Sequence, residues 1–373
     1  MDRREFLQLV SASPLLATET QASLPVYHVV TPFAPEPGAG MPGAYRGQVA
    51  RVHAASCIDE KTDAVDREVV RRMLSSGMRA LTGEKSERDA WARFIAPKDV
   101  VGIKVNSSGA PNMMSMPELV AGIVENVIGV GVPPENIWIY ERMGDQMRMI
   151  HYDRFVPAKV NVWTAEHSRS SILGYEPRVY VDVDFFGEDD TRSCLVRLVS
   201  EKLTKIINVP NMKEHQAAGV TGCLKNISYG NFSNVARSHR LQKTNTYSFI
   251  GTLAAVEPVR SRTVLNIMDG LRGVWHAGPF SMDRRFRFYP KQIMFGSDPV
   301  AMDRLLIDVI EAKRRAEGAP SIFDRSPEHL QSAYSRDPMK NAFIREPGHV
   351  QYAAGLGLGE YDIARIKVEA IEL

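Results

Sequence analysis

The sequence predicts an α/β fold with a mainly parallel sheet flanked by helices. Short apolar runs typical of buried strands alternate with segments whose apolar residues recur at helical spacing. The clearest case is the order of residues 100–105, 117–131 and 136–140, which predicts a strand, a helix that begins at a proline and ends at a glycine, and a second strand. This order is typical of a parallel crossover unit. Because ligands of such sheets bind where strands end, we expect the functional site at the strand carboxyl ends.

The same two patterns predict the other elements. Apolar runs predict strands at residues 49–56, 160–165, 178–183, 205–209, 263–268, 291–295 and 366–370. Helical spacing predicts helices at residues 86–94, 143–150, 195–203, 217–227 and 247–256. We expect a further helix that Asp63 caps and that ends before Gly77, and a long one in which Asp298 is the N-cap and Pro299 the first residue.

Composition limits the classes of function. The 373 residues are 44% hydrophobic and 24% charged, so the chain can bury a large core, as one large domain or two intimate ones. A net charge of +2, without zinc-finger spacing or an arginine stripe, does not favour a nucleic-acid partner. No run of eighteen apolar residues is present, so we expect no stable membrane span.

The first 22 residues differ from the rest of the chain. Arg3, Arg4, Phe6 and Leu7 precede a modest apolar run and resemble a twin-arginine signal. The resemblance implies that the twin-arginine machinery exports the folded protein to a bacterial periplasm, a route common for proteins whose cofactor is inserted in the cytoplasm. The alternative is an amphipathic or disordered N-terminus. Residues 23–48 are rich in proline and glycine and predict an extended arm, and residues 49–373 form the expected α/β domain.

The three cysteines, Cys57, Cys194 and Cys223, are too few and too scattered to hold an iron–sulfur cluster within the chain. Their spacing allows one disulfide and does not choose the pair. Cys223 is two residues from Lys225 and is either a site residue or a small buried side chain.

The stretch at residues 206–230 contains the densest set of chemically useful side chains. After the strand, Pro210 interrupts the ladder, and a polar cluster of Asn211, Lys213, Glu214 and His215 follows. A turn with Gly219, Thr221 and Gly222 then leads to Lys225 and Asn226. We expect these side chains to face one pocket, where the first turn of the following helix would offer free N–H groups to an anion. The alternative is a strand, a turn and a helix whose polar residues are solvated.

Three other places could contribute to this pocket. Lys104 and Asn106 end a predicted strand beside a glycine loop, or they are a solvent-facing lysine and a turn asparagine. Asp269 follows another strand and opens a loop that contains His276, or it bonds nearby N–H groups in a turn. His239 together with His215 makes a metal site conceivable, although the two do not form a compact ligand motif.

Several motifs together resemble the family described as domain of unknown function 362 (DUF362). They are IKVN at residues 103–106, VPNMKEHQAAGVTGCLKN at 209–226, His239, MDG at 268–270 and GSDPVAMD at 296–303. The resemblance covers residues 49–316 and implies no established reaction. Many relatives carry ferredoxin-type cysteine repeats, which this chain lacks.

A more distant likeness concerns His215 and Lys225, a histidine and a lysine ten positions apart on either side of Gly219–Gly222. This pattern is similar to the core of the nickel-pincer lactate racemases. The likeness implies that Lys225 attaches the pincer cofactor, that His215 is an acid–base and that His239 binds nickel.

These observations predict an exported enzyme that acts on a small anionic or hydroxylated molecule with a metal or redox cofactor, as an oxidoreductase or a racemase or epimerase. The expected catalytic residues are His215, Lys225 and Asp269, and the expected metal ligands are His215 and His239. The expected cofactor-binding residues are Lys104, Asn106, Lys213, Gly219, Thr221, Gly222 and Asn226. The alternative is a periplasmic protein that binds or matures a ligand or metal without turnover.

Overall fold

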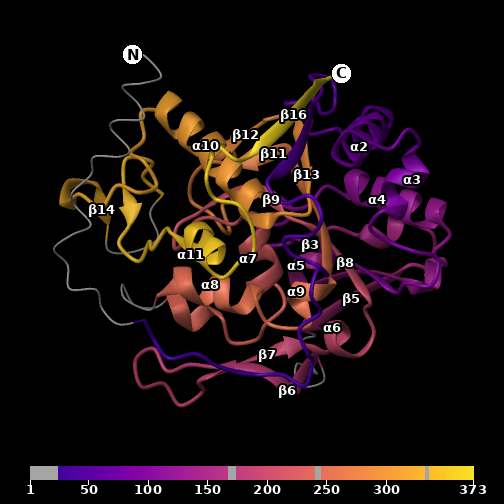
Figure 1. Cartoon of the computed structure of the whole chain (residues 1–373). Helices are drawn as coiled ribbons and strands as arrows, with labels where there is room; N and C mark the ends of the chain where they lie inside the picture. The colour runs from indigo at the N-terminus through magenta and orange to yellow at the C-terminus, as the bar shows by residue number, and fades with distance from the viewer. Residues whose placement is uncertain (1–23, 167–173, 240–244, 332–335) are drawn as a thin grey trace.

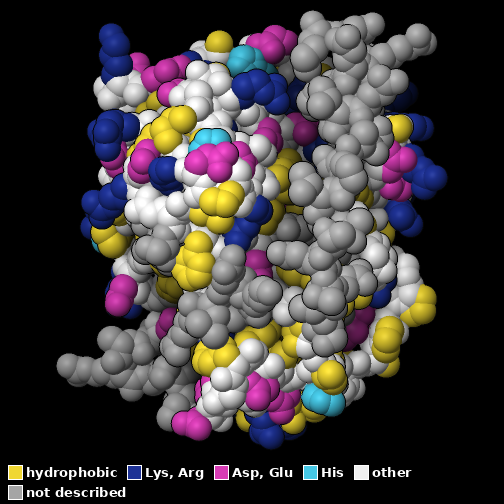
Figure 2. Space-filling view, turned by 90° about the vertical axis from the view of Figure 1, so that its left-hand side faces the viewer, with side chains coloured by type: hydrophobic (Ala, Val, Ile, Leu, Met, Phe, Trp, Pro, Cys, Tyr) yellow, Lys and Arg dark blue, Asp and Glu magenta, His cyan; other side chains and the backbone are white. Residues whose placement is uncertain are grey.

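The computed structural model describes residues 24–166, 174–239, 245–331 and 336–373 (Figure 1). The expected twin-arginine signal at residues 1–22 lies outside the described residues. Among the described residues no helix is both long and apolar enough to cross a membrane. On the face seen in Figure 2, described side chains of both charges are interspersed.

A large twisted sheet forms the centre of the molecule, and it is mainly parallel as predicted. Its strand order is β16-β2-β13-β11-β8-β3-β4-β5. The only antiparallel neighbours along this path involve β13, which runs against β2 and β11. The bounds are β2 (Gln48–His53), β3 (Val101–Val105), β4 (Ile137–Met143), β5 (Asn161–Glu166), β8 (Lys205–Val209), β11 (Thr263–Val274), β13 (Gln292–Gly296) and β16 (Lys367–Glu372).

Helices cover both faces of this sheet, so each face has its own core. On one face pack α2 (Arg67–Thr82), α3 (Glu87–Ala92) and α4 (Pro117–Val130), and α4 provides the predicted crossover between the parallel strands β3 and β4. On the other pack α7 (Gly222–Tyr229), α8 (Thr246–Ala254), α10 (Pro299–Ala316) and α11 (His349–Gly355), as Figure 1 shows. Three short helices complete the set: α5 (Gly144–Arg148), α6 (Arg197–Glu201) and α9 (Val259–Arg262).

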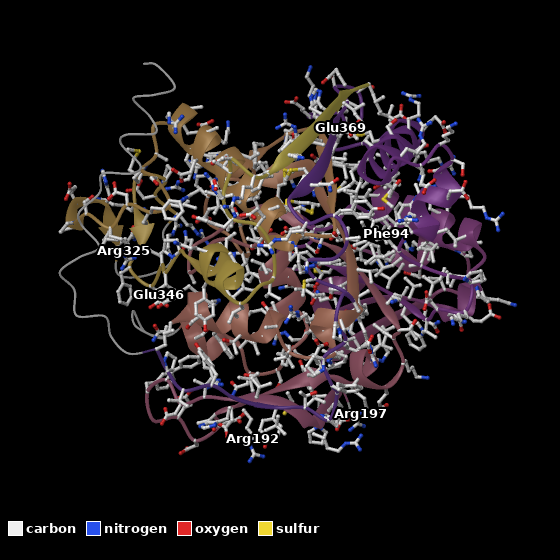
Figure 3. The ribbon with its side chains drawn as sticks, in the orientation of Figure 1. Phe94, Arg192, Arg197, Arg325, Glu346 and Glu369 are labelled. Carbon is white, nitrogen blue, oxygen red and sulfur yellow. The ribbon has the colours of Figure 1, made fainter. Side chains whose placement is uncertain are left out.

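A second, antiparallel sheet contains β1 (His28–Val30), β6 (Tyr175–Asp182) and β7 (Arg192–Val196). Arg192 and Arg197 mark this region at the bottom of Figure 3. The prolines and glycines of residues 23–48 predict an extended arm, but this segment supplies β1 and buries Met41, so part of it is packed. The helix expected at residues 195–203 is shorter, because residues 192–196 pair with β6.

The predicted start and end of α2 are wrong for identifiable reasons. Asp66 is the N-cap, because its Oδ1 accepts hydrogen bonds from the N–H groups of Glu68 at 2.9 Å and Val69 at 3.0 Å. Gly77 does not end the helix; a side chain there would collide with the ring of Phe295 in β13, so the glycine permits close helix–sheet packing. The predicted cap at Asp298 is confirmed, with Oδ1 accepting from the N–H of Ala301 at 2.9 Å.

Candidate functional site

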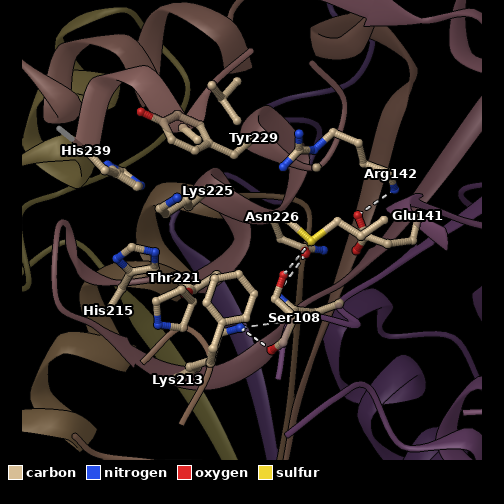
Figure 4. Close-up of a pocket in the computed structure, with 17 residues that line it drawn as sticks. Ser108, Glu141, Arg142, Lys213, His215, Thr221, Lys225, Asn226, Tyr229 and His239 are labelled. Carbon is tan, nitrogen blue, oxygen red and sulfur yellow. Dashed lines mark hydrogen bonds between the residues drawn. The ribbon is translucent and has the colours of Figure 1, made fainter. Parts of the chain in front are cut away.

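A cavity of about 340 Å³, partly open to solvent, lies where β3, β4 and β8 end. Polar side chains converge on it from these strand ends, from α7 and from the short helical turn at Ala236–His239 (Figure 4). Seven residues expected from the sequence line it: Asn106, Lys213, His215, Thr221, Lys225, Asn226 and His239. Glu141, Arg142 and Tyr229 line it as well, and the sequence did not single them out.

Strand β9 (Asn211–His215) positions the two central side chains. The sequence predicts a loop here, yet after Pro210 the polar cluster pairs with β11 and with β10 (Gly219–Val220). Alternation along a strand places Lys213 and His215 on the cavity side and Glu214 on the opposite side. There Glu214 forms a buried ion pair with Arg345 and accepts a hydrogen bond from the N–H of Gly278 at 2.9 Å.

Lys213 is held at one end of the cavity and has no counter-charge of its own. Its Nζ donates hydrogen bonds to Oδ1 of Asn106 at 2.9 Å and to the carbonyl of Ser108 at 3.0 Å. The side chain is 1% exposed, and within the described residues it forms no ion pair. Burial lowers the pKa of Lys213 to about 7, while the charge of Glu141 opposes that shift.

Hydrogen bonds between successive asparagine side chains fix the orientation of the Asn106 amide, whose Oδ1 accepts the hydrogen bond from Lys213. Nδ2 of Asn106 donates to Oδ1 of Asn226 at 3.1 Å, and Nδ2 of Asn226 donates to Oδ1 of Asn208 at 2.8 Å. Nδ2 of Asn208 then donates to Oδ1 of Asn266 at 2.8 Å. Each amide therefore turns its oxygen toward Lys213. The sequence analysis missed Asn208 and Asn266, although a buried amide within an apolar strand is a signal that could have found them.

Lys225 projects from α7 into the cavity. Its Nζ lies 3.6 Å from the centre of the Tyr229 ring, and in Figure 4 it lies between that ring and His215. Lys225 is 6% exposed, and within the described residues Nζ makes no hydrogen bond and no ion pair. Burial lowers the pKa of Lys225 well below its ordinary value, and the positive charges of Lys213 and Arg142 lower it further.

His215 is held in one tautomer. Its Nδ1 accepts a hydrogen bond from the N–H of Ala217 at 3.0 Å, so the proton of the neutral ring is on Nε2. Burial, followed by the charges of Lys225 and His239, lowers the pKa of His215 well below its ordinary value. A neutral imidazole with its proton on Nε2 suits proton exchange. It does not suit metal binding through Nε2, because ligating histidines donate from the other ring nitrogen.

His239 provides the second imidazole. Its ring centre lies 5.2 Å from that of His215, and the ring stacks on Tyr229 at 5.3 Å. Nε2 of His239 is buried and has no hydrogen-bond partner among the residues that the structure describes, so it is available to a ligand or a metal ion. In the part of the chain that the structure describes, no three His, Cys, Asp or Glu side chains form a group that could hold a metal ion.

Lys104 lies behind the cavity wall instead of lining it. Its Nζ donates to Oε2 of Glu141 at 2.9 Å and to the carbonyl of Val105 at 2.7 Å. Arg142 likewise pairs with Glu166 at 2.9 Å. Glu141 and Arg142 therefore each form an ion pair with a neighbouring residue. Among the described residues that line the cavity, Lys213 and Lys225 are the cations without an ion pair.

The start of α7 is not open to an anion. The helix begins at Gly222, later than expected, and the carboxylate of Asp303 accepts hydrogen bonds from the N–H groups of Cys223 at 2.5 Å and Leu224 at 2.9 Å. The predicted role of these N–H groups in ligand binding is therefore wrong. Gly222 has a positive φ of 56° and packs against Asp303, while Gly219 packs near Ile322. Both glycines are therefore explained by the backbone conformation and the close packing at these positions.

The structure does not bring Asp269 to the cavity. Strand β11 continues through this residue to Val274, and the Asp269 carboxylate accepts hydrogen bonds from the N–H groups of Met116 at 2.7 Å and Leu271 at 3.0 Å. His276 is also buried elsewhere, beside Arg314. The predicted catalytic role of Asp269 finds no support in this geometry.

Comparison with known proteins places this site within a family. The model of the domain of unknown function DUF362 matches residues 101–308, which is more than half of the chain. The chain belongs to the DUF362 family. All the cavity residues named above lie within the matched DUF362 region.

Other comparisons add no function to the DUF362 assignment. No curated protein matches the chain. A crystal structure of a protein from Thermotoga maritima aligns with a TM-score of 0.38 at 10% sequence identity, over 67% of this chain and 59% of that protein. A likeness at this level carries no argument about fold or function.

Proposed function

We propose that this DUF362 protein is an exported enzyme that acts on a small anionic molecule in the cavity, with His215 as the acid–base. The observation that carries the proposal is the pair of buried lysines, Lys213 and Lys225, which have no ion-pair partner among the described residues and face the same cavity as a neutral imidazole. In the sequence-based hypothesis Lys104 shares the task of holding an anion. We now assign that task to Lys213, since Lys104 is paired with Glu141.

The charge of the wall supports an anionic ligand. Burying an unpaired ammonium group costs several kcal/mol, and a bound anion removes much of that cost. Lys213 already gives two of its donors to Asn106 and Ser108, which leaves a third for the ligand. Nε2 of His215 carries the proton of the neutral ring, so it can donate that proton to the bound molecule and take one back later in the reaction.

A cofactor-dependent reaction, as an oxidoreductase or a racemase or epimerase, is part of the proposal. The residues present fit one part of a nickel-pincer group: Lys225 offers an amine for covalent attachment and His239 offers Nε2 to the metal. Such a group supplies hydride transfer when bound. Because Nε2 of His215 carries the proton, we assign this residue to proton transfer and not to metal binding.

The second candidate function is a periplasmic protein that holds a ligand or metal without turnover. Its support is the same cavity lined by buried lysines, which would suit retention of an anion. The two functions differ in what His215 contributes, since only an enzyme needs its proton exchange.

One experiment separates these functions. The protein is purified from the cytoplasm before export and examined by elemental analysis and intact mass spectrometry. A stoichiometric metal or a covalent adduct on Lys225 supports the enzyme. An apo-protein of unmodified mass that retains a small anion and does not convert it would favour the binding role.

A further inference from the structure

The amines of the two cavity lysines, Lys213 and Lys225, differ in the contacts that they make. Nζ of Lys213 is fixed by two hydrogen bonds to oxygen acceptors, so it is oriented to bind an anion. Nζ of Lys225 has only the Tyr229 ring beneath it and no hydrogen bond within the described residues. An amine that is desolvated and close to another cation is the kind of lysine that acts as a nucleophile toward carbonyl carbon.

The surroundings of Lys225 also contain what such a reaction needs. His215 lies on one side of Lys225 in Figure 4, and its Nε2 can carry protons between the amine and an oxygen atom. Lys225 itself is only 6% exposed, which limits the water that reverses imine formation. The Tyr229 ring stabilises a positive charge placed above it, including that of an iminium ion.

We propose that Lys225, where it carries no covalently attached cofactor, forms an imine with small 2-oxo acids, with its Nζ bonded to the carbonyl carbon and Lys213 holding the carboxylate. A molecule that carries a carboxylate next to a carbonyl group can place the carboxylate on Lys213 and the carbonyl carbon at Lys225 at the same time. The inference rests on the anion site of the proposed function and names the substrate class for it.

The atoms of the reaction balance without an oxidant or a reductant. The lone pair of the neutral Lys225 amine attacks the carbonyl carbon, and the new C–N bond forms as the C=O π electrons move to oxygen. Nε2 of His215 gives its proton to the alkoxide oxygen and takes one back from the nitrogen, which leaves a neutral carbinolamine. The hydroxyl group then takes one further proton from solvent, the C–O bond breaks, and water leaves the protonated imine.

Reductive trapping tests this inference on the full chain. The wild-type protein is incubated with pyruvate and sodium cyanoborohydride, and adducts are located by intact mass and peptide mapping. We expect one adduct per chain, on Lys225, with trapping faster there than at exposed lysines at neutral pH, because burial lowers the pKa of Lys225. The variant Lys225→Arg should form no such adduct, whereas the exposed-site control Lys98→Arg should match the wild type.

A second variant tests the role of the carboxylate. Lys213→Met should slow trapping of pyruvate by about 10-fold or more, which corresponds to about 1.4 kcal/mol, and should leave trapping of acetaldehyde at Lys225 within about twofold. A slowing that is equal for both probes would overturn the assignment of Lys213. Thermal melts of each variant establish that it is folded.

The experiments distinguish a wrong imine assignment from a wrong assignment of the anion site. Calorimetric binding of pyruvate without any adduct on Lys225, or adducts spread evenly over exposed lysines, would overturn the imine and leave the anion site standing. If neither pyruvate nor inorganic phosphate binds the folded wild-type chain, both the inference and the proposed function are wrong.

Discussion

Oδ2 of Asp303 accepts a hydrogen bond from the backbone N–H of Leu224 at 2.9 Å, although 79 positions separate the two residues. Asp303 belongs to α10 and Leu224 to the first turn of α7, so this contact fixes one helix against the other. Lys225 follows directly on α7. Asp303 therefore sets the position of the cavity lysine without touching the cavity itself.

This contact depends on the absence of a side chain at Gly222. We expect Gly222→Ala to lower the free energy of unfolding by about 2–4 kcal/mol, because the new Cβ would collide with the Asp303 carboxylate and the residue has a positive φ. The control is Gly83→Ala, which has a similar positive φ and open space around it and should cost about 1 kcal/mol. Equal losses in urea unfolding would show that backbone conformation alone matters at Gly222.

Substitutions of His215 and of Lys225 should impair different steps, turnover in the first case and ligand retention in the second. With any substrate that the wild-type protein turns over, His215→Gln should lower turnover by about 10²–10⁴-fold and largely preserve binding, since a glutamine cannot relay the proton. Lys225→Ala should instead abolish retention of the ligand or cofactor. Kinetics and calorimetry measure the two effects, with the exposed His28→Gln as the matched control. If both variants stay folded and behave like the wild type, the cavity is not the active site.

Lys213 should make the stability of the free protein depend on pH. Its pKa is about 7 in the folded protein and has its ordinary value of 10.5 in the unfolded chain, so between these values the unfolded chain binds more protons. The contribution of Lys213 to the free energy of unfolding is therefore lowest below about pH 7 and rises with pH through this window. The slope is at most about 1.4 kcal/mol per pH unit.

The variant Lys213→Met isolates this contribution. We expect Lys213→Met to be more stable than the wild type at about pH 6, and the difference to shrink by about pH 9. Urea unfolding at both pH values measures it, and Lys98→Met provides the exposed control. A difference between variant and wild type that does not change with pH would refute an uncompensated charge at Lys213.

Export should depend on the two arginines near the N-terminus. Replacing Arg3 and Arg4 together by lysine should trap the precursor in the cytoplasm, because the twin-arginine machinery reads that pair. Fractionation of expressing cells measures the distribution. The control replaces Arg72 and Arg79, two exposed arginines of α2, by lysine. Periplasmic delivery of the Arg3 and Arg4 variant at the wild-type level would remove the proposed localisation.

The predictions from local patterns were accurate where local chemistry decides the structure. Pro117 and Gly131 bound α4 as expected, and Asp298 with Pro299 begins α10. The end of α2 could not be predicted at Gly77, because the reason for a glycine there is the ring of Phe295, which arrives from a strand more than two hundred residues later.

The sequence by itself determined the alternation of strands and helices, and the cluster of Lys213, His215 and Lys225, because periodicity and residue type are properties of neighbouring positions. Only the tertiary structure decided which charges are matched. Glu141 neutralises Lys104 and Asp303 occupies the start of α7. Lys213 and Lys225 have no ion-pair partner within the described part of the chain. The physical reason is that the cost of a buried charge depends on groups within a few ångströms, and those groups come from strands and helices that are distant in the chain.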